Sequence, residues 1–278
     1  MQRKIGAKKS LGQHFLTSRR AIWQIVGAGK IVAGETVLEI GPGKGVLTKA
    51  LLESGARVVA IEKDRELVEL LEKTFEKEIA VGGLKLINGD VLELETSDLG
   101  LRAGEYKIIA NIPYYITGQF LRKFLSGDTQ PQSMVLLLQK EVVSRIIARD
   151  GKESILSISV KAYGTPKLIG KVPARDFKPA PQVDSAIIFI ENISKKNFMS
   201  EIAGKVTEKM EKIKEEKFFE LVRAGFLHKR KKLIRNFEVV AGQEAIQNAF
   251  RECEISTDTR AEDLTLEKWL ELCEKISV

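Results

Sequence analysis

Short apolar runs alternate with stretches of helical period between residues 36 and about 192. The clearest runs cover residues 36–40, 57–62, 84–87, 106–110 and 133–138. Each is almost uniformly apolar, which is typical of a parallel strand that is buried on both faces. A final run at 183–191 is expected to be antiparallel. The alternation predicts an α/β protein with a doubly wound, Rossmann-like sheet.

The two ends of the chain have a different pattern. Residues 1 to about 30 predict a basic arm and a first helix whose apolar face is Ile22, Trp23, Ile25 and Val26, with Trp23 in the core. From about Lys195 onward the period is helical and the faces are charged. We therefore expect two domains, 1–193 and a smaller α-helical domain at 194–278, with an extended helix over 195–216 at the junction.

A glycine-rich turn, Gly41-Pro42-Gly43-Lys44-Gly45, separates the run at 36–40 from a helical pattern. Glycines let the backbone approach a ligand closely, and the helix N-terminus that follows favours polar or anionic groups. The spacing Gly-x-Gly-x-Gly differs from the dinucleotide fingerprint. The turn also lacks the Gly-Lys-Ser/Thr ending of a P-loop, which argues against nucleoside triphosphate hydrolysis.

Two carboxylates follow the next two strands. Glu62 lies 21 positions after Gly41, the distance at which an acid accepts hydrogen bonds from ribose hydroxyls. Asp90 could accept a hydrogen bond from an adenine amino group. The plainer interpretations are a solvated carboxylate at a strand end for Glu62 and a turn cap for Asp90. Both residues should lie at the ligand-binding edge of the sheet.

The sequence Asn111-Ile112-Pro113-Tyr114 follows the strand at 106–110. The Asn111 side-chain oxygen and the Ile112 carbonyl could each accept one N–H of a planar amine. Pro113 would fix the backbone, and Tyr114 could stack on the ring that carries the amine. An ordinary Asn-x-Pro turn is the alternative. Together with the upstream residues, the pattern predicts a site for an aminated base.

With these motifs, the chain resembles the family of adenine N6,N6-dimethyltransferases that act on small-subunit ribosomal RNA. The segments that carry the resemblance are 9–16, 39–43, 111–116, 177–185 and 260–265. The resemblance implies a methyltransferase that uses S-adenosyl-L-methionine as cofactor. It also implies that the enzyme dimethylates adenine in small-subunit ribosomal RNA during ribosome assembly, and we expect two adjacent adenines as the targets. The implied cofactor residues are Gln13, His14, Leu16, Gly41, Gly43, Glu62, Lys63, Asp90, Val91 and Asn111.

The resemblance also places the target base. Phe177, in the late motif, would form a sandwich with Tyr114 around the flipped adenine, giving Asn111, Ile112, Pro113, Tyr114 and Phe177 as the catalytic set. The alternative for Phe177 is an aromatic side chain that fills the core. Two other functions stay open: a macrolide-resistance methyltransferase that acts on large-subunit ribosomal RNA, and a non-catalytic RNA-binding assembly or transcription factor.

Positive charge is concentrated in two clusters. The formal net charge is +7, and the first twenty residues hold six cations and no acid, Lys8 and Lys9 among them. The second cluster, predicted to lie on a helix, contains Lys229, Arg230, Lys231, Lys232 and Arg235. A solvated helix face is the alternative, but two clusters beside a catalytic cleft predict contacts to RNA phosphates.

Other features exclude several classes of site. Two cysteines and two histidines without ligand spacing indicate no metal site and a reducing compartment. No apolar run reaches 18 residues, and the basic N-terminus lacks the apolar segment of a secretory signal. We therefore expect a cytoplasmic monomer that binds small-subunit ribosomal RNA or the assembling subunit and no membrane.

Overall fold

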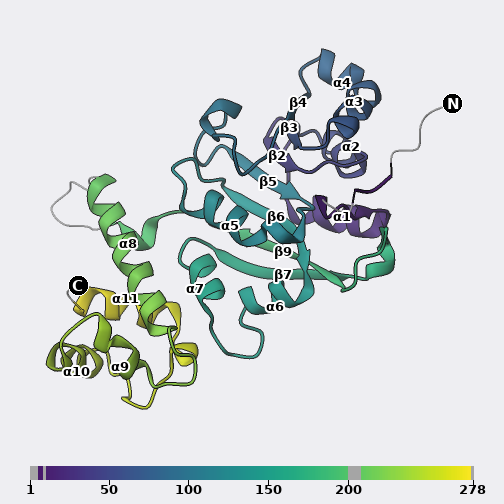
Figure 1. The fold of residues 1–278 in the computed structure, drawn as a ribbon. Coiled ribbons are helices and arrows are strands. Elements are labelled where there is room, and N and C mark those ends of the chain that lie inside the picture. The colour runs from purple at the N-terminus through teal and green to yellow at the C-terminus, as the bar shows by residue number, and fades with distance from the viewer. Residues whose placement is uncertain (1–5, 9–10, 200–207, 277–278) are drawn as a thin grey trace. The chain divides into compact units, whose positions relative to one another are not determined.

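The computed structural model describes residues 6–8, 11–199 and 208–276 (Figure 1). By their contacts the residues divide into two compact units. The first unit comprises Met1–Val143 and Thr165–Ile193, and the second comprises Ser144–Gly164 and Ser194–Val278. The sequence-based domain limits remain a prediction, and the segment 144–164 is grouped with the helical part of the chain rather than with the sheet.

A seven-stranded sheet forms the centre of the first unit, as the apolar runs predicted. Its order is β4-β3-β2-β5-β6-β9-β7. The strands are β2 (Thr36–Ile40), β3 (Arg57–Glu62), β4 (Leu84–Asn88), β5 (Tyr106–Ala110), β6 (Ser133–Gln139), β7 (Thr165–Val172) and β9 (Ser185–Glu191). The pairs among β4, β3, β2, β5 and β6 are parallel, whereas β9 is antiparallel to β6 and β7.

The strand order reverses between β2 and β5. From β2 the chain proceeds outward to β3 and β4, then returns to add β5 on the other side of β2. Such a switch point opens a crevice at the carboxyl ends of the strands, where ligands bind in open α/β sheets. The glycine turn follows β2 and the Asn111 loop follows β5, so the topology brings both segments to this crevice.

Helices cover both faces of the sheet. On one face, buried residues of α1 (Arg19–Ala28), α2 (Val46–Glu53) and α3 (Arg65–Thr74) form a core with every second strand residue, such as Val135 and Leu137. The intervening strand residues are buried as well, so the opposite face is also covered. The remaining helices of this unit are α4 (Glu76–Ala80), α5 (Thr117–Ser126) and α6 (Lys140–Ile146), of which α6 ends in the second unit.

The prediction that Trp23 lies in the core is wrong. Ile22, Ile25 and Val26 are buried, but the side chain of Trp23 is 58% exposed. Each helical residue advances by about 100°, so Trp23 falls beyond the stripe that Ile22 and Val26 define. The indole therefore faces away from the sheet.

The second unit is built from helices, as predicted. They are α7 (Ile155–Lys161), α8 (Glu208–Gly225), α9 (Leu233–Asn236), α10 (Gln243–Glu252) and α11 (Leu266–Lys275). Trp269 is fully buried at their centre, and its ring lies 5.6 Å from that of Phe226 and 6.1 Å from that of Phe237. The described residues of this unit contain no strand.

The segment predicted as a long helix over 195–216 has two described parts. Lys196–Phe198 forms one turn of 3-10 helix, and α8 begins at Glu208. Residues 200–207 lie outside the described residues. Helix α8 continues to Gly225, so the last part of the predicted segment belongs to a helix that extends nine residues beyond it.

The basic cluster at 228–235 was predicted to lie on a helix, and this is wrong for most of it. Helix α8 ends at Gly225, and residues 226–232 form turns before α9 begins at Leu233. The Asn236 side-chain amide donates to the Gly225 carbonyl at 2.5 Å and to the His228 carbonyl at 3.3 Å. The first bond satisfies the carbonyl group of the last residue of α8, and the cations from Lys229 to Lys232 lie on the loop that follows.

Candidate functional site

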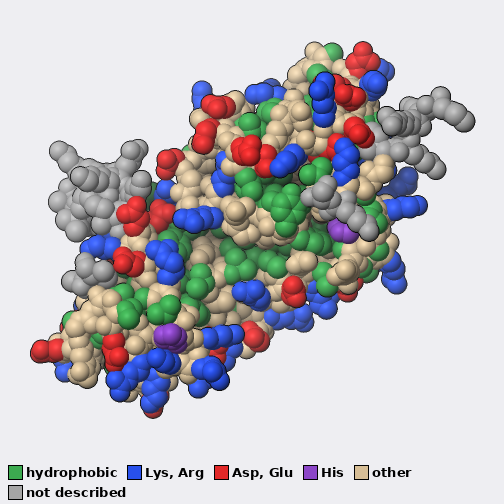
Figure 2. Space-filling view, in the orientation of Figure 1, with side chains coloured by type: hydrophobic (Ala, Val, Ile, Leu, Met, Phe, Trp, Pro, Cys, Tyr) green, Lys and Arg blue, Asp and Glu red, His purple; other side chains and the backbone are tan. Residues whose placement is uncertain are grey.

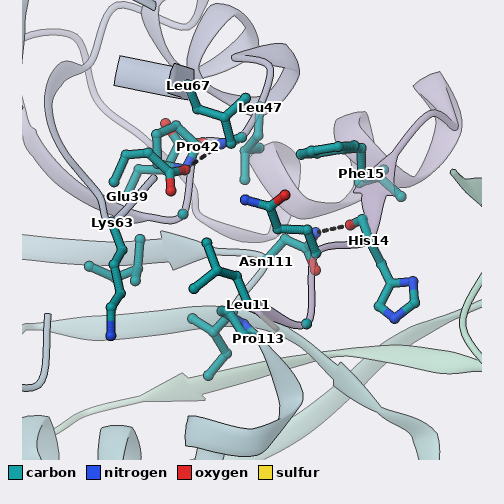
Figure 3. Close-up of a pocket in the computed structure, with 18 of the residues that line it drawn as sticks. Leu11, His14, Phe15, Glu39, Pro42, Leu47, Lys63, Leu67, Asn111 and Pro113 are labelled. Atoms are coloured by element: carbon teal, nitrogen blue, oxygen red, sulfur yellow. Dashed lines mark hydrogen bonds between the residues drawn. The ribbon is translucent and has the colours of Figure 1, made fainter. Parts of the chain in front are cut away.

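A cleft of about 390 Å³ opens at the carboxyl ends of β2, β3, β4 and β5 (Figure 3). All of its lining residues belong to the first unit. Residues 11–17 of the N-terminal arm form one wall, and the loops after the four strands form the others. Every predicted cofactor residue lines the cleft, as do three more of the predicted catalytic set, Ile112, Pro113 and Tyr114.

Glu62 connects the two loops that flank the cleft. Its Oε2 accepts the Gly43 N–H at 3.1 Å, and its Oε1 accepts the Asp64 N–H at 2.9 Å. Burial raises the pKa of Glu62, and these backbone hydrogen bonds partly counter that rise. Each carboxylate oxygen has two acceptor sites, so both oxygens can still accept from a ligand's hydroxyl groups.

Gly43 allows the arm to pack against the glycine turn. Its φ of 59° lies in the left-handed region that residues other than glycine rarely adopt. A Cβ atom at this position would lie 3.0 Å from the Phe15 ring. The Phe15 ring also lies 4.9 Å from the Nζ of Lys44. The absence of a side chain at Gly43 thus determines how closely the arm approaches the turn.

Glu39 is a buried acid that the sequence-based site did not include. It lies in β2 two residues before Gly41 and lines the cleft, with 1% of its surface exposed. Its Oε2 has no hydrogen-bond partner in the described part of the protein. Burial, with a contribution from the nearby Glu62 charge, raises the pKa of Glu39 to about 8. An unpartnered buried carboxyl favours a cationic or proton-donating ligand group.

Asp90 forms an ion pair across the mouth of the cleft. Its Oδ2 lies 2.7 Å from the Nζ of Lys63, and its Oδ1 accepts the Leu92 N–H at 2.9 Å. Partial burial works against ionisation, but the Lys63 hydrogen bond and the turn hold the pKa of Asp90 below its usual value. Asp90 therefore does cap the turn, and this role leaves acceptor sites on Oδ2 for a ligand.

The Asn111 side chain is held by the arm. Its Nδ2 donates to the His14 carbonyl at 3.3 Å, as the dashed line beside the His14 label in Figure 3 marks. Since the amide nitrogen is held in this way, the amide oxygen remains as an acceptor. The His14 ring bonds through Nδ1 to the Pro179 carbonyl at 2.8 Å. Asn111 and His14 thus bring the loop after β5 and the arm together.

Tyr114 is anchored by its hydroxyl group. The Oη of Tyr114 lies 2.6 Å from the Ser185 Oγ at the start of β9, and burial raises the pKa of this phenol. The ring is half-buried and lines the cleft. The hydrogen bond holds the end of the side chain in place, so the ring stays beside the cleft, where it can serve as a stacking surface.

Phe177 does not face the cleft, so its predicted place in an aromatic sandwich is wrong for this structure. Its side chain is 4% exposed and belongs to the core beneath α1. It lies in a short antiparallel pairing between β1 (Phe15–Leu16) and β8 (Phe177–Lys178), in which Leu16 is the partner of Phe177 and both side chains are buried. Adjacent strand residues point to opposite faces, and the exposed neighbour Lys178 lines the cleft instead.

Lys8 was predicted to contact RNA, but in the structure it is paired within the protein. Its Nζ lies 2.7 Å from Asp64 Oδ1 and 3.4 Å from Glu66 Oε1. Gln13 completes the contact, since its Nε2 donates to Asp64 Oδ2 at 3.0 Å and its Oε1 accepts the Lys8 N–H at 2.8 Å. The arm is therefore tied to the start of α3. Lys9 lies outside the described residues.

The cations of the second cluster differ in their partners. Lys229, Arg230 and Lys231 are exposed and form no ion pair with a described residue. Lys232 pairs with Asp258, and Arg235 lies 2.7 Å from Glu238. Figure 2 shows Lys and Arg side chains gathered around α9. Three of the five predicted contacts are thus free to meet an external anion.

Three features of the site were missed in the sequence: Glu39, Phe15 and Asp64. Glu39 had a readable signal, because it is a carboxylate inside an otherwise apolar run directly before the glycine turn. Phe15 and Asp64 act through contacts with distant segments, so no local spacing indicates them. In the described residues, no three or more His, Cys, Asp or Glu gather as metal ligands, and no helix could span a membrane.

Solved structures with the same fold include two nucleic-acid-related transferases. A dimethyladenosine transferase from Plasmodium falciparum superposes with a TM-score of 0.77 at 24% identity, covering 93% of this chain and 96% of that one. The 23S rRNA methyltransferase ErmE gives a TM-score of 0.72 at 23% identity, covering 94% and 98%. At these identities the likeness establishes the fold.

Sequence comparison goes further. Residues 5–277 match the model of a family described as ribosomal RNA adenine dimethylase. Ribosomal RNA small subunit methyltransferase A of Dehalococcoides mccartyi is 37% identical over 269 residues, which is 96% of this chain and 87% of that protein. The protein with the same name in Thermosynechococcus vestitus is 35% identical over 278 residues, 97% of each chain. The chain therefore belongs to the ribosomal RNA adenine dimethylase family, and it is a methyltransferase.

Proposed function

We propose that this protein transfers methyl groups from S-adenosyl-L-methionine to N6 of adenine in small-subunit ribosomal RNA, two groups on each of two adjacent adenines, during ribosome assembly. The observation that carries the proposal is Asn111. Its amide nitrogen is engaged by His14, at the switch point of the sheet, and its oxygen is available to an amine. The small-subunit substrate is supported by the name that both relatives bear.

The cleft fits the proposed cofactor. Glu62 would hold the ribose hydroxyls and Asp90 the adenine amino group, since both carboxylates keep acceptor sites beyond their internal hydrogen bonds. The buried Oε2 of Glu39 lacks a partner among the described residues, so it can meet the ammonium group of the cofactor, and a cation bound there would favour loss of the Glu39 proton. When bound, the cofactor supplies an electrophilic methyl carbon.

The protein's own contribution is to hold and polarise the target amine. In the first transfer the Asn111 oxygen and the Ile112 carbonyl accept the two N–H groups of the amine, which favours a more tetrahedral nitrogen, and in the second transfer one of these acceptors holds the N–H that remains. The same acceptors stabilise the positive charge that develops on that nitrogen, an electrostatic contribution that often dominates catalysis. A methylated ammonium is acidic enough to lose its proton to water, so no histidine base is needed.

To reach the cleft, the adenine must leave its stack. With Phe177 in the core, the aromatic residues that line the cleft are Phe15, Tyr114, Tyr115 and the His14 ring. Tyr114 lies in the same loop as Asn111, and its hydroxyl group is held by a hydrogen bond to Ser185. We assign Tyr114 to one face of the base, where stacking contributes roughly 1–3 kcal/mol.

The second candidate is methylation of large-subunit ribosomal RNA. The fold likeness to the 23S rRNA methyltransferase favours it, but that likeness is shared with the dimethyladenosine transferase. The relatives at 35–37% identity bear the small-subunit name, so we rank the small subunit first. We further infer that the protein acts as a monomer in the cytoplasm, where ribosomal subunits assemble.

The decisive experiment compares substrates. Purified protein and S-adenosyl-L-methionine are incubated with unmethylated small subunits or with unmethylated large subunits, and methylated adenines are mapped by mass spectrometry. Dimethyladenine in the small-subunit RNA alone supports the proposal. Methylation of large subunits alone would establish the second candidate. Cofactor binding without methylation of either would indicate a non-catalytic role.

A further inference from the structure

A group of cations in the first unit has no role in the chemistry described above. Arg19 and Arg20 lie in the first turn of α1, and Arg175 and Lys178 lie in the segment before β9. All four side chains are exposed. None of them forms an ion pair with a described residue, although such pairs link many other charged side chains of the protein. Their charges are therefore available to an external partner.

Backbone hydrogen bonds bring these four residues together. The pairing of β1 with β8 is extended by Thr17, whose N–H and hydroxyl donate to the Asp176 carbonyl at 2.8 and 2.9 Å. Arg19 lies two residues after Thr17, and Arg175 directly precedes Asp176. The Asp176 carboxylate is the one acid in residues 17–20 and 175–178.

The group of cations begins at the cleft. Lys178 lines the cleft, whereas Arg19 and Arg20 lie beyond the β1–β8 pairing on the helix that follows. In Figure 2, Lys and Arg side chains lie at the margin where Figure 1 places α1. An anionic chain whose reacting nucleotide occupies the cleft would meet these charges next.

Trp23 adds an aromatic surface to the same helix. It lies three residues after Arg20 and four after Arg19, so the three side chains are neighbours on the exposed side of α1. Its indole is 58% exposed. It forms no ring contact or cation–π contact with a described residue. Single exposed apolar residues are common, but here the exposed residue is a large ring beside two unpaired arginines.

We propose that Lys178, Arg175, Arg19, Arg20 and Trp23 hold the unpaired RNA strand that flanks the target adenine. The cations contact phosphates, and Trp23 stacks on a base. This proposal rests on the proposed function. Sites for single-stranded nucleic acid combine a positive track with aromatic side chains in this way. Enzymes that modify a base act on single-stranded substrate or flip the base out of its stack, and we take the flank of the target adenine to be single-stranded.

The test uses variants matched in charge. Arg19→Gln combined with Arg20→Gln removes two cations from the proposed path. The control, Lys73→Gln combined with Lys77→Gln, removes two exposed cations that form no ion pair with a described residue. They lie on α3 and α4, which pack on β4 at one edge of the sheet, whereas α1 packs on β6 and on β7 at the other edge. Binding to unmethylated small subunits is measured over a range of salt concentrations. We expect the arginine variant to lower the log–log slope by about 0.7 for each lost contact, and the lysine variant to retain it.

Trp23 is tested separately. Trp23→Ala should weaken binding by about five- to a hundredfold, as expected for the loss of one base stack, with the salt slope unchanged. Trp23→Phe should retain most of the affinity. The emission of Trp23 should also be quenched by oligoadenylate in the wild type. This quenching should be lost in Trp23→Phe, because the remaining Trp269 is fully buried.

The outcomes separate this proposal from the proposed function. If the wild type does not methylate small subunits, the proposed function is wrong. If the wild type is active but the arginine variant keeps the slope of the lysine variant, the path is wrong and the function stands. A third outcome is that Trp23→Ala weakens binding, the arginine variant keeps the wild-type salt slope, and oligoadenylate leaves the Trp23 emission unchanged. In that case α1 contacts a protein of the subunit, and the assignment of this surface to RNA fails.

Discussion

Lys8 and Asp64 join the N-terminal arm to the start of α3, with 2.7 Å between the Lys8 Nζ and Asp64 Oδ1. Asp64 is at the same time the N-cap of α3, where its Oδ1 accepts the Glu66 N–H at 3.1 Å. The Asp64 N–H in turn donates to Glu62. One residue thus connects the arm, a helix and the carboxylate that we assign to the ribose.

This contact predicts how fast the cofactor leaves. Asp64→Asn keeps an N-cap side chain but removes the charge that holds Lys8. Because Lys8 is 39% exposed, the contribution of the pair should be small, so S-adenosyl-L-methionine should dissociate only modestly faster in stopped-flow measurements. Glu66→Gln, which affects the weaker contact of the same lysine at 3.4 Å, is the matched control. Equal rates in Asp64→Asn and the wild type would show that the arm does not retain the cofactor.

Asn111→Ala should separate catalysis from binding. We expect methyl transfer to fall by a hundredfold or more, since about 3 kcal/mol of transition-state stabilisation depends on the amide oxygen. The affinity for small subunits should change little, because the phosphate contacts lie elsewhere. Single-turnover rates and binding constants measured on the same preparation test this. Near-normal turnover would exclude the proposed amine contact.

Glu62→Ala should weaken S-adenosyl-L-methionine binding by about 1–3 kcal/mol, the loss of charge-assisted hydrogen bonds to ribose. Part of this loss of affinity would reflect a change in the loops beside the cleft, because Glu62 also accepts hydrogen bonds from the Gly43 and Asp64 N–H groups. Calorimetry therefore has to be combined with thermal melting. Glu93→Ala, an exposed acid near the cleft that does not line it, serves as control. Unchanged affinity in a folded Glu62→Ala protein would remove Glu62 from the site.

Glu39 predicts a pH dependence of stability. Burial raises its pKa from the ordinary value of 4.5 to about 8, so the folded protein retains a proton that the unfolded chain releases. Stability should then fall as pH rises between these two values, by at most about 1.4 kcal/mol per pH unit. Glu39→Gln removes this contribution. Urea unfolding from pH 5 to 8.5 should show a shallower decline for Glu39→Gln than for the wild type, and parallel curves would contradict the assignment.

The loop cations predict a graded effect on RNA affinity. Replacing Lys229, Arg230 and Lys231 together by Gln should weaken binding to small subunits and lower the log–log salt slope by about 0.7–0.9 for each lost phosphate contact. Lys232→Gln alone should have a smaller effect, because Asp258 already neutralises Lys232. Cofactor affinity should be unchanged. If the triple variant retains the wild-type slope, the loop has a structural or protein-contacting role.

The residues predicted most accurately are those at the carboxyl ends of strands. Apolar runs identify parallel strands, and parallel strands place their ends at one edge, so the sequence alone groups Gly41, Glu62, Asp90 and Asn111 at one cleft. Their partners could not be predicted in the same way. The ion pairs of Asp90 and Lys8 depend on side-chain positions that the strand pattern does not specify.

The errors have physical causes of two kinds. Phe177 was misplaced because its position depends on a strand pairing with Leu16, a residue far away in the sequence. The loop before α9 was predicted to be helical because lysine, arginine and leucine favour helices. The structure overrides that preference, since the Asn236 amide binds the Gly225 carbonyl, and a Cβ atom at Gly225 would lie 2.4 Å from the Trp269 ring.

The β1–β8 pairing has a consequence for biosynthesis. Residues 15 and 16 leave the ribosome early, but their strand partners are residues 177 and 178. The arm wall of the cleft can therefore form only after about two thirds of the chain has been translated. Contacts between such distant segments also form slowly, because a long loop must close first. A nascent chain that already contains the glycine turn and Asn111 would still lack a finished cleft, so this enzyme acquires its activity late in its own synthesis.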